Sequence, residues 1–192
     1  MTDIHILMTG AKIKIREKAL TDARNDYQWC RSEELSRLDA AFPINMNLSQ
    51  YIDEFTLELR YPSLTRHRFA VDTLDGEHIG NCSYYNIDVK RGEAEIGIMI
   101  GNSDYWNKGY GTDTIRTLIN YIFNHTSFNR LYLKTLEWNI RAQRCFLKCG
   151  FTPYNQLPRD GYKFLLMELT RQQWQKQKKE QEHDEQSKPP TR

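Results

Sequence analysis

Apolar and polar positions alternate with two different periods along the chain, and these periods predict strands and helices in a definite order. Residues 12–17 alternate charged and β-branched side chains, which is the period of a half-buried strand. Residues 20–38 carry apolar side chains near helical spacing and predict a helix, either continuous or broken. Asn47 and Gln50 form a capping-box pattern, so a second helix begins there and ends before Pro62.

The middle of the chain predicts three consecutive strands. Two runs of strand-forming residues, 68–74 and 77–88, flank the pair Asp75-Gly76, which favours a tight turn between paired strands. Residues 94–101 predict a third strand after a short turn. We therefore expect a meander of strands in this region.

Two strand–helix units follow the meander. From Thr112 onward, apolar residues recur at the spacing of an amphipathic helix. Residues 130–136 predict a strand, Asn139 then caps another helix, and Gly150 stands where a left-handed C-cap is wanted. A final strand at 163–169 completes an α+β fold with a mixed central sheet.

The length of the chain and the composition of its ends predict one domain. A chain of 192 residues can close a hydrophobic core by itself. We place a short lead at 1–10 and the domain at 11–170. The remaining residues, 171–192, form a charged, Gln-rich tail that cannot bury much apolar surface, so we expect a frayed helix passing into partial disorder.

Charge and residue spacing exclude several classes of function. The net charge of +2 gives no general attraction to nucleic acid or to an anionic membrane surface, so we expect neither as a partner. Four Cys and five His show no metal-ligand spacing, so we expect no metal site. No leader or membrane-spanning run is evident, which indicates a cytoplasmic protein. The sequence leaves open a monomer or a homodimer.

The loop between the third strand of the meander and the next helix is suited to an anion. Gly109 and Gly111 stand at the entrance of the helix, where unpaired N–H groups and the helix dipole attract negative charge, and Lys108 adds a positive charge nearby. An ordinary strand-to-helix turn is the competing interpretation. Only G-x-G is present, so the P-loop pattern G-x-x-x-x-G-K-[ST] is not matched, and the dinucleotide fingerprint fails because Thr114 stands where its third glycine is needed.

The order of these motifs resembles the GNAT superfamily of acetyl-CoA-dependent N-acyltransferases. The resemblance rests on a strand with acidic residues at 93–100, the loop at 106–113, the strand at 130–136 and the segment at 139–151. It is closest to the branch of the ribosomal-protein N-terminal acetyltransferases and spermidine acetyltransferases. The resemblance implies a mostly antiparallel sheet flanked by helices in one domain, with acetyl-CoA as cosubstrate and no metal.

The resemblance also assigns the residues that bind the coenzyme. In the family, backbone amides of the loop hold the diphosphate and the preceding strand pairs with the pantetheine arm. Trp106 departs from the pattern, because Gln or Arg is usual there. The implied contacts are Asn107, Lys108, Gly109, Tyr110, Gly111 and Thr112 for the diphosphate, Ile98, Met99 and Ile100 for pantetheine, and Asn139, Ala142 and Phe146 at the pantetheine end. For Asn139, a role as a helix N-cap is an alternative, and both roles can hold.

Glu95 is the candidate general base. Strand alternation places it on the same face as Gly97 and Met99, and the family's usual base matches this position. The alternative is a structural glutamate paired with a Lys or Arg on a neighbouring strand. Glu93 has the same parity and is the second candidate.

The general acid is less well defined by the sequence. Many family members have a tyrosine where this chain has Phe146, which cannot donate a proton. Cys145 and Tyr154 are substitutes within range in sequence, and the sequence does not choose between them. A thiolate is a tolerable leaving group without an acid.

These observations predict acetyl transfer to a primary amine by direct attack in a ternary complex. The amine is either a protein N-terminus or a small molecule, and residues 27–60 and 154–162 should determine which. A coenzyme-binding module that has lost catalysis is the alternative from another class of function.

Overall fold

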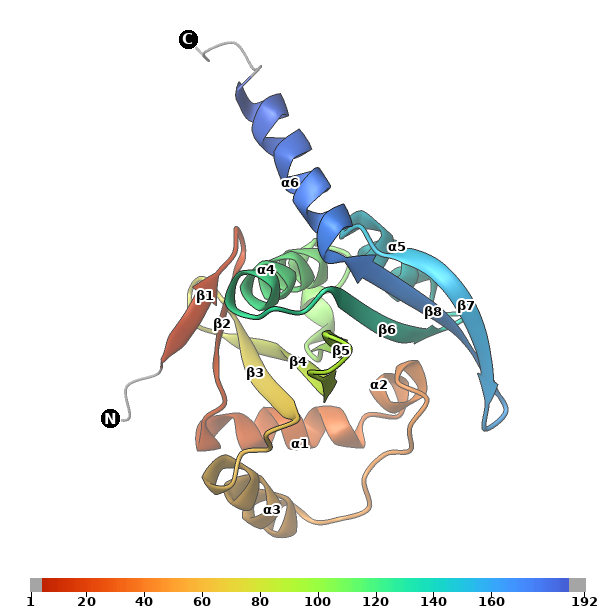
Figure 1. The fold of residues 1–192 in the computed structure, drawn as a ribbon. Coiled ribbons are helices and arrows are strands. Elements are labelled where there is room, and N and C mark those ends of the chain that lie inside the picture. Colours follow the sequence, from red (N-terminus) through yellow and green to blue (C-terminus); the bar gives the residue numbers. More distant parts are fainter. Residues whose placement is uncertain (1–4, 187–192) are drawn as a thin grey trace.

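A mixed eight-stranded sheet runs through the computed structural model, which describes residues 5–186 (Figure 1). The strands lie in the order β1-β2-β3-β4-β5-β6-β8-β7. All neighbouring pairs are antiparallel except β5 and β6, which are parallel, so the predicted α+β class with a mixed sheet is confirmed. The strands are β1 (Ile6–Thr9), β2 (Ile13–Glu17), β3 (Arg66–Thr73), β4 (His78–Asp88), β5 (Glu93–Ile100), β6 (Arg130–Leu136), β7 (Thr152–Arg159) and β8 (Tyr162–Thr170).

Six helices accompany the sheet in the described part of the chain, with α1, α2 and α3 on one side of it and α4 and α5 on the other (Figure 1). The helix expected over 20–38 is broken at Ser32, whose hydroxyl accepts a bond from the Leu35 amide and so caps a new helix. The capping box of Asn47 and Gln50 is present as predicted. The helices are α1 (Ala23–Arg31), α2 (Glu33–Leu38), α3 (Leu48–Arg60), α4 (Tyr110–His125), α5 (Ile140–Lys148) and α6 (Arg171–Gln186), with 3-10 turns η1 (Leu20–Asp22) and η2 (Ser103–Tyr105).

The two faces of the sheet differ in polarity. The face under α4 is apolar because alternate strand residues pack against one stripe of that helix. Fully buried residues of this layer include Ile13, Ile15, Val71 and Ile79 on the strands and Ile115, Leu118 and Ile122 on α4. The opposite face, under α1–α3, carries buried polar and charged side chains, so those helices cover a polar layer rather than a second apolar core.

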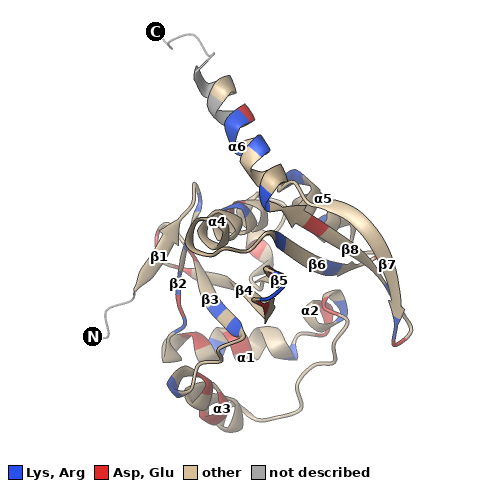
Figure 2. Ribbon diagram, in the orientation of Figure 1, with Lys and Arg blue, Asp and Glu red and all other residues tan. Residues whose placement is uncertain are grey.

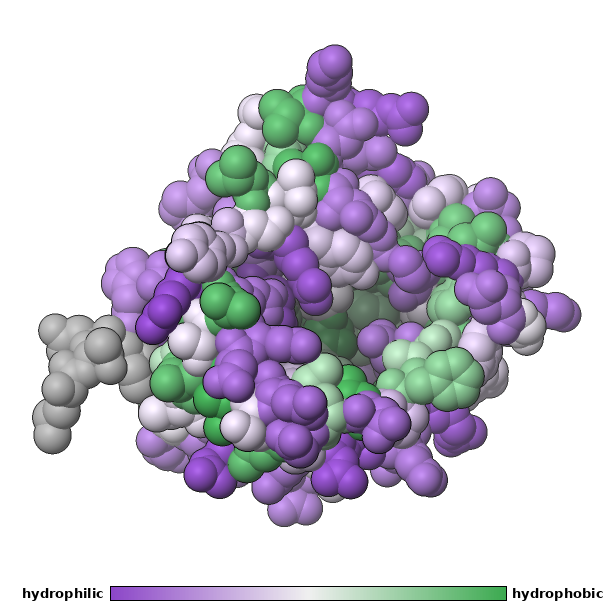
Figure 3. Space-filling view, turned by 90° about the horizontal axis from the view of Figure 1, so that it is seen from below, coloured by the Kyte–Doolittle hydropathy of each residue, from purple (hydrophilic) through white to green (hydrophobic). Residues whose placement is uncertain are grey.

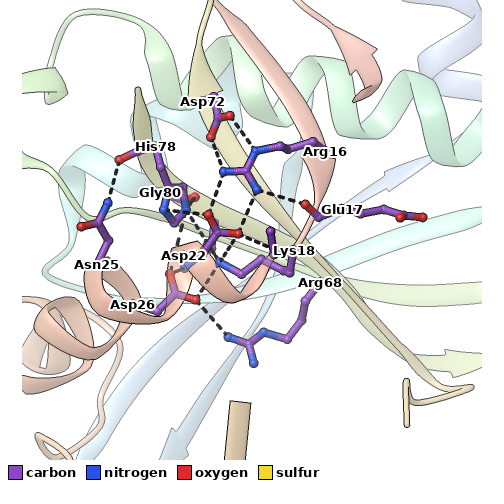
Figure 4. A network of polar contacts seen from close by, with 12 residues as sticks. Arg16, Glu17, Lys18, Asp22, Asn25, Asp26, Arg68, Asp72, His78 and Gly80 are labelled. Carbon is purple, nitrogen blue, oxygen red and sulfur yellow. Dashed lines mark hydrogen bonds and ion pairs between the residues drawn. The ribbon is translucent and has the colours of Figure 1, made fainter. Parts of the chain in front are cut away.

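A network of ion pairs joins α1 to this polar face (Figure 4; Figure 2 shows the mixed charges where the elements meet). The Arg16 guanidinium contacts Asp72 at 2.6 Å and Asp22 at 2.7 Å. Lys18 contacts Asp26 at 2.6 Å. All five side chains are at least nine-tenths buried, so each charge depends on its partner instead of on water.

The ends of the chain differ from the expected boundaries. Residues Ile6–Thr9, placed in the lead by the sequence, form β1 and pair with β2. At the other end, Arg171 donates hydrogen bonds to the carbonyls of Phe123, Thr126 and Phe128, so the start of α6 is fixed to the domain. The disorder expected at the end of the tail falls partly on residues 187–192, which lie outside the described residues. No helix within 5–186 has the length and apolar character needed to cross a membrane.

Candidate active site

β5 and β6 form a fork. They pair over only three residues of β5, from Glu93 opposite Arg130 to Glu95 opposite Tyr132. Beyond Glu95, β5 continues to Ile100 and β6 to Leu136, and no further pairing joins them in the described chain. One edge of β5 is therefore left without a strand partner, and we call the space beside it the fork.

The backbone of Ile98 and Ile100 faces the fork. The Gly101 amide bonds to the Ile79 carbonyl on β4, so strand alternation turns the polar groups of Ile98 and Ile100 the other way. The indole N–H of Trp106 accordingly donates to the Ile100 carbonyl at 2.6 Å. Met99, also predicted to bind pantetheine, directs its backbone towards β4 instead. An extended ligand could pair with the free edge at Ile98 and with the Ile100 amide.

The N-terminus of α4 meets the fork with free amides. Gly109 is the N-cap at φ 87°, and no side chain caps the helix. The first bond of the helix joins the Asp113 amide to the Gly109 carbonyl at 3.0 Å. The amides of Tyr110, Gly111 and Thr112 therefore precede any acceptor within the helix and are available to an anion. We call these three amides, together with the loop at 107–109, the cradle.

Nearby charged side chains favour an anion at the cradle. Asp113 accepts bonds from the Ala11 and Lys12 amides at 3.1 and 2.7 Å, so its carboxylate is held by the β1–β2 turn. The Lys12 ammonium donates to the Lys108 carbonyl at 2.9 Å, next to Gly109. The positive charge of Lys12, which sequence reasoning did not connect with the loop, is thus added beside it.

Glu95 lies buried where the two strands separate. Its Oε1 accepts a hydrogen bond from the Tyr85 hydroxyl at 3.1 Å and lies 3.0 Å from the Lys134 ammonium. Its Oε2 accepts from the Asn86 side-chain amide at 2.8 Å. The carboxylate thus lies where the fork opens, and it also has the Lys partner of the structural alternative. Glu93 lies at the closed end of the fork.

Two residues predicted to contact pantetheine, Asn139 and Phe146, also have structural roles in the protein. The Asn139 side chain accepts from the Ala142 amide at 3.2 Å, which is the N-cap role. Phe146 is 5% exposed and packs edge-on against Phe151 with ring centroids 6.0 Å apart. Whether Asn139, Ala142 and Phe146 also contact pantetheine stays a prediction.

The two candidate acids lie in different places. Cys145 lies at the cradle, with its sulfur 3.6 Å from the Thr112 hydroxyl. Hydrogen bonding from the Cys149 thiol lowers the pKa of Cys145, against the opposite effect of burial. Tyr154 lies on β7 beside Arg130, whose guanidinium is 4.9 Å from its ring centroid. Arg130 also pairs with Glu93 at 2.7 Å, so Tyr154 belongs to the closed end of the fork.

Sequence reasoning did not find the partners of Glu95. Tyr85 and Asn86 come from β4 and Lys134 from β6, so only the register of three strands brings them together. Asn86 has φ 50° and lies at an irregularity in the β4–β5 pairing, which the sequence does not mark.

A second opening on the surface lies on the face covered by α1–α3. Figure 3, seen from the α3 side, shows this face hollowed near its middle, with hydrophobic residues at the floor of the hollow. Trp29 belongs to the segment 27–60 that was expected to determine the acceptor; it is 9% exposed and packs against His78 with ring centroids 4.9 Å apart, so it fills space in the interior. Phe42 is 91% exposed on the loop between α2 and α3.

Comparisons with known proteins agree with this geometry. A family model described as an acetyltransferase (GNAT) domain matches residues 12–152. An uncharacterised N-acetyltransferase, p20, of Bacillus licheniformis is 28% identical over 64% of this chain and 69% of its own length. A spermine/spermidine N(1)-acetyltransferase of Bacillus subtilis is 28% identical over 50% of this chain and 66% of its own length.

Solved structures share the fold. A spermidine N-acetyltransferase from Vibrio cholerae, in complex with CoA and spermine, superposes with a TM-score of 0.76 over 85% of this chain and 98% of that chain, at 16% identity. An aminoglycoside acetyltransferase in complex with coenzyme A gives 0.71 over 86% and 99%, at 20% identity. At sequence identities of 16% and 20%, these structures show that the fold is shared and nothing more.

Proposed function

Because this chain belongs to the GNAT acetyltransferase family, we propose that it transfers the acetyl group of acetyl-CoA to a primary amine by direct attack in a ternary complex. GNAT acetyltransferases use acetyl-CoA as their cosubstrate. One observation carries the proposal: the fork leaves a strand edge free between a buried carboxylate, Glu95, and a helix entrance with unpaired amides.

The residues around the fork fit the coenzyme. The cradle offers amides and a helix dipole to the diphosphate, and its Gly109 leaves the approach to the backbone open. The free edge at Ile98, with the Ile100 amide, can pair with the amide groups of the pantetheine arm as an added strand would. Acetyl-CoA supplies a thioester that the amine attacks, and an amide on this edge can donate to the carbonyl oxygen as it gains charge.

Glu95 would accept the proton that the amine must lose. An ammonium group is not nucleophilic, so a base has to remove one proton before or during attack. Lys134 and Tyr85 fix the position of the carboxylate at the fork. Since Phe146 cannot donate a proton, the sulfur would leave as a thiolate, which the ordinary pKa of a thiol, about 8.5, allows.

A small polycationic amine is the acceptor that the comparisons favour. Two of the similar proteins are named for spermine, spermidine or both, and another for aminoglycosides. All of these compounds carry primary amines. We expect an acceptor to approach through the hollow on the α1–α3 face. A protein N-terminus stays the alternative acceptor.

An assay of the full chain tests the function. The protein is incubated with acetyl-CoA and, separately, spermine, spermidine, kanamycin and peptides with free N-termini, while thiol release is followed and products are identified by mass. We expect amine-dependent release with one acetyl group added per thiol. Saturable coenzyme binding without release on any amine would leave only the second candidate.

That second candidate is a coenzyme-binding module without catalysis. It is favoured by the contacts of Glu95, since both carboxylate oxygens already have partners. The absence of a tyrosine at Phe146 points the same way. Substitution of Glu95, described in the Discussion, separates the two candidates.

A further inference from the structure

Arg141 reaches from α5 to the loop that precedes α4. Its guanidinium carbon lies 3.5 Å from the centroid of the Trp106 ring, the distance of a close stack. Arg141 follows β6 in the chain, whereas Trp106 follows β5. The stack therefore joins the two branches of the fork beyond the point where their strands separate.

Trp106 holds this stack in a fixed place. Its indole N–H donates to the Ile100 carbonyl at 2.6 Å, on the edge of β5 that faces the fork. This bond anchors the indole nitrogen to the strand, so the ring offers the guanidinium a surface tied to β5. Stacking leaves the N–H groups at the rim of a guanidinium free to donate.

The register of α5 places Arg141 beside the cradle. Cys145 lies one helical turn further along the same face. Its sulfur is 3.6 Å from the Thr112 hydroxyl, and a Cβ on Gly111 would lie 3.7 Å from it. This face of α5 therefore runs along the entrance of α4, and Arg141 continues it towards the loop.

The charge of Arg141 has no counter-ion in the described structure. Among the side chains that the structure describes, no carboxylate lies within ion-pair distance of its guanidinium. Burial lowers the pKa of Arg141 below its ordinary value, and the more distant Glu34 acts against this. A half-buried cation next to free amides and a helix dipole forms a positive site that an anion would stabilise.

We propose that Arg141, held against Trp106, is a ligand of the coenzyme's diphosphate. The assignment rests on the proposed function, because it takes the cradle to be the diphosphate site. It places two positively polarised groups, the α4 amides and a guanidinium, on opposite sides of the same anion. Arg suits this role because its planar fork can donate two hydrogen bonds to phosphate oxygens.

Calorimetric titration of the full chain with three compounds tests the assignment. These are coenzyme A, dephospho-coenzyme A, which keeps the diphosphate, and pantetheine, which lacks it. We expect Arg141→Gln to weaken binding of the first two by roughly ten- to a hundredfold, the usual effect of a charge-assisted hydrogen bond, and to leave pantetheine binding unchanged. Arg141→Lys should recover only part of the loss, since Lys keeps the charge but not the fork.

Arg144 on the same helix is the matched control. It is exposed, and Arg144→Gln removes the same charge without touching the loop, so it should leave all three affinities unchanged. Equal binding of dephospho-coenzyme A by Arg141→Gln and the wild type would overturn the assignment, as would a loss confined to coenzyme A, which would place Arg141 at the 3′-phosphate. If the wild type binds no coenzyme at all, the proposed function itself fails.

Discussion

Glu95 and Lys134 meet across the base of the fork, with Oε1 and Nζ 3.0 Å apart. Glu95 is the last residue of β5 that pairs with β6, and Lys134 lies two residues beyond its pairing partner Tyr132. The ion pair thus stands where the strands begin to separate. It fixes the carboxylate beside the free strand edge, and it also offers the plain structural role that competes with catalysis.

Substitution of Glu95 separates catalysis from coenzyme binding. Glu95→Gln keeps the shape of the side chain and can still bond to Tyr85, but it cannot accept a proton. We expect kcat to fall by about 10²–10⁴-fold, the usual contribution of a general base, while the Kd for coenzyme A stays unchanged. Steady-state kinetics and calorimetry on the same preparation measure the two quantities.

Glu93→Gln is the control for this substitution. Glu93 is paired with Arg130 at the closed end of the fork, so its loss should leave kcat near that of the wild type. A large loss in Glu93→Gln with full activity in Glu95→Gln would mean that the base has been assigned to the wrong residue.

If the cradle binds the diphosphate, a methyl group added at Gly109 should weaken coenzyme binding. Gly109 has φ 87°, and a Cβ there would lie 3.8 Å from the Lys12 ammonium, on the side from which we expect an anion to approach. Gly109→Ala should raise the Kd for coenzyme A at least about tenfold, which is ~1.4 kcal/mol. It should also cost about 1 kcal/mol of folding free energy, because alanine is strained at positive φ.

Gly76 provides the matched control for this prediction. It has φ 92° in the β3–β4 turn, with nothing near its would-be Cβ. Gly76→Ala should show the same loss of stability and an unchanged Kd. Equal affinities in the two variants would remove the cradle from the coenzyme site.

Local signals in the sequence were enough for most of the fold. Asn47 with Gln50 marks the start of α3, and Gly150 ends α5 at φ 91° as a left-handed C-cap should. The short β1 was not predicted, since its four residues show no period and depend on pairing with β2. Local patterns of this kind need only neighbouring residues, whereas β1 needs a partner strand.

The candidate site was only partly predictable for a similar reason. The cradle is one continuous segment, so its glycines and lysine could be recognised together. The contacts of Glu95 with Tyr85 and Lys134 depend on strand register, and the stack of Arg141 on Trp106 joins residues 35 positions apart. No pattern in a single sequence specifies such a pairing.

The buried ion network should be costly to break. Asp72 accepts from the Arg16 guanidinium at 2.6 and 3.0 Å in a buried layer. Asp72→Asn removes the negative charge and leaves Arg16 with Asp22 alone, so we expect a loss of about 3 kcal/mol in the free energy of unfolding. Urea denaturation measures it. Asp160→Asn, in an exposed turn, is the control and should change little; similar losses in both variants would contradict the role given to the buried pair.

His78 should make the protein less stable in mild acid. Burial lowers the pKa of His78 from its ordinary 6.5, with Lys18 acting in the same direction and Asp22 and Asp26 against it. As pH falls through 6.5 the unfolded chain takes up a proton that the folded protein excludes, so the free energy of unfolding falls until the lower folded pKa is reached. Burial raises the pKa of Asp22, but hydrogen bonds from Arg16 and Ala19 outweigh it and lower the pKa below its ordinary 3.8, so the stability that Asp22 contributes is lost only below about pH 3.8, a separate window.

Unfolding of His78→Gln between pH 7 and pH 5 measures this contribution. The slope of unfolding free energy against pH should be smaller than in the wild type, with the remainder due in part to His67, whose pKa burial also lowers. An unchanged slope would show that His78 takes up its proton equally in both states.

A crystal structure of the full chain with coenzyme A tests the central claim most directly. We predict the diphosphate on the amides of 109–112 and the pantetheine arm along Ile98 and Ile100, with the sulfur end towards Glu95. Coenzyme bound elsewhere, or a fork closed by protein side chains in crystals grown at saturating coenzyme, would contradict it.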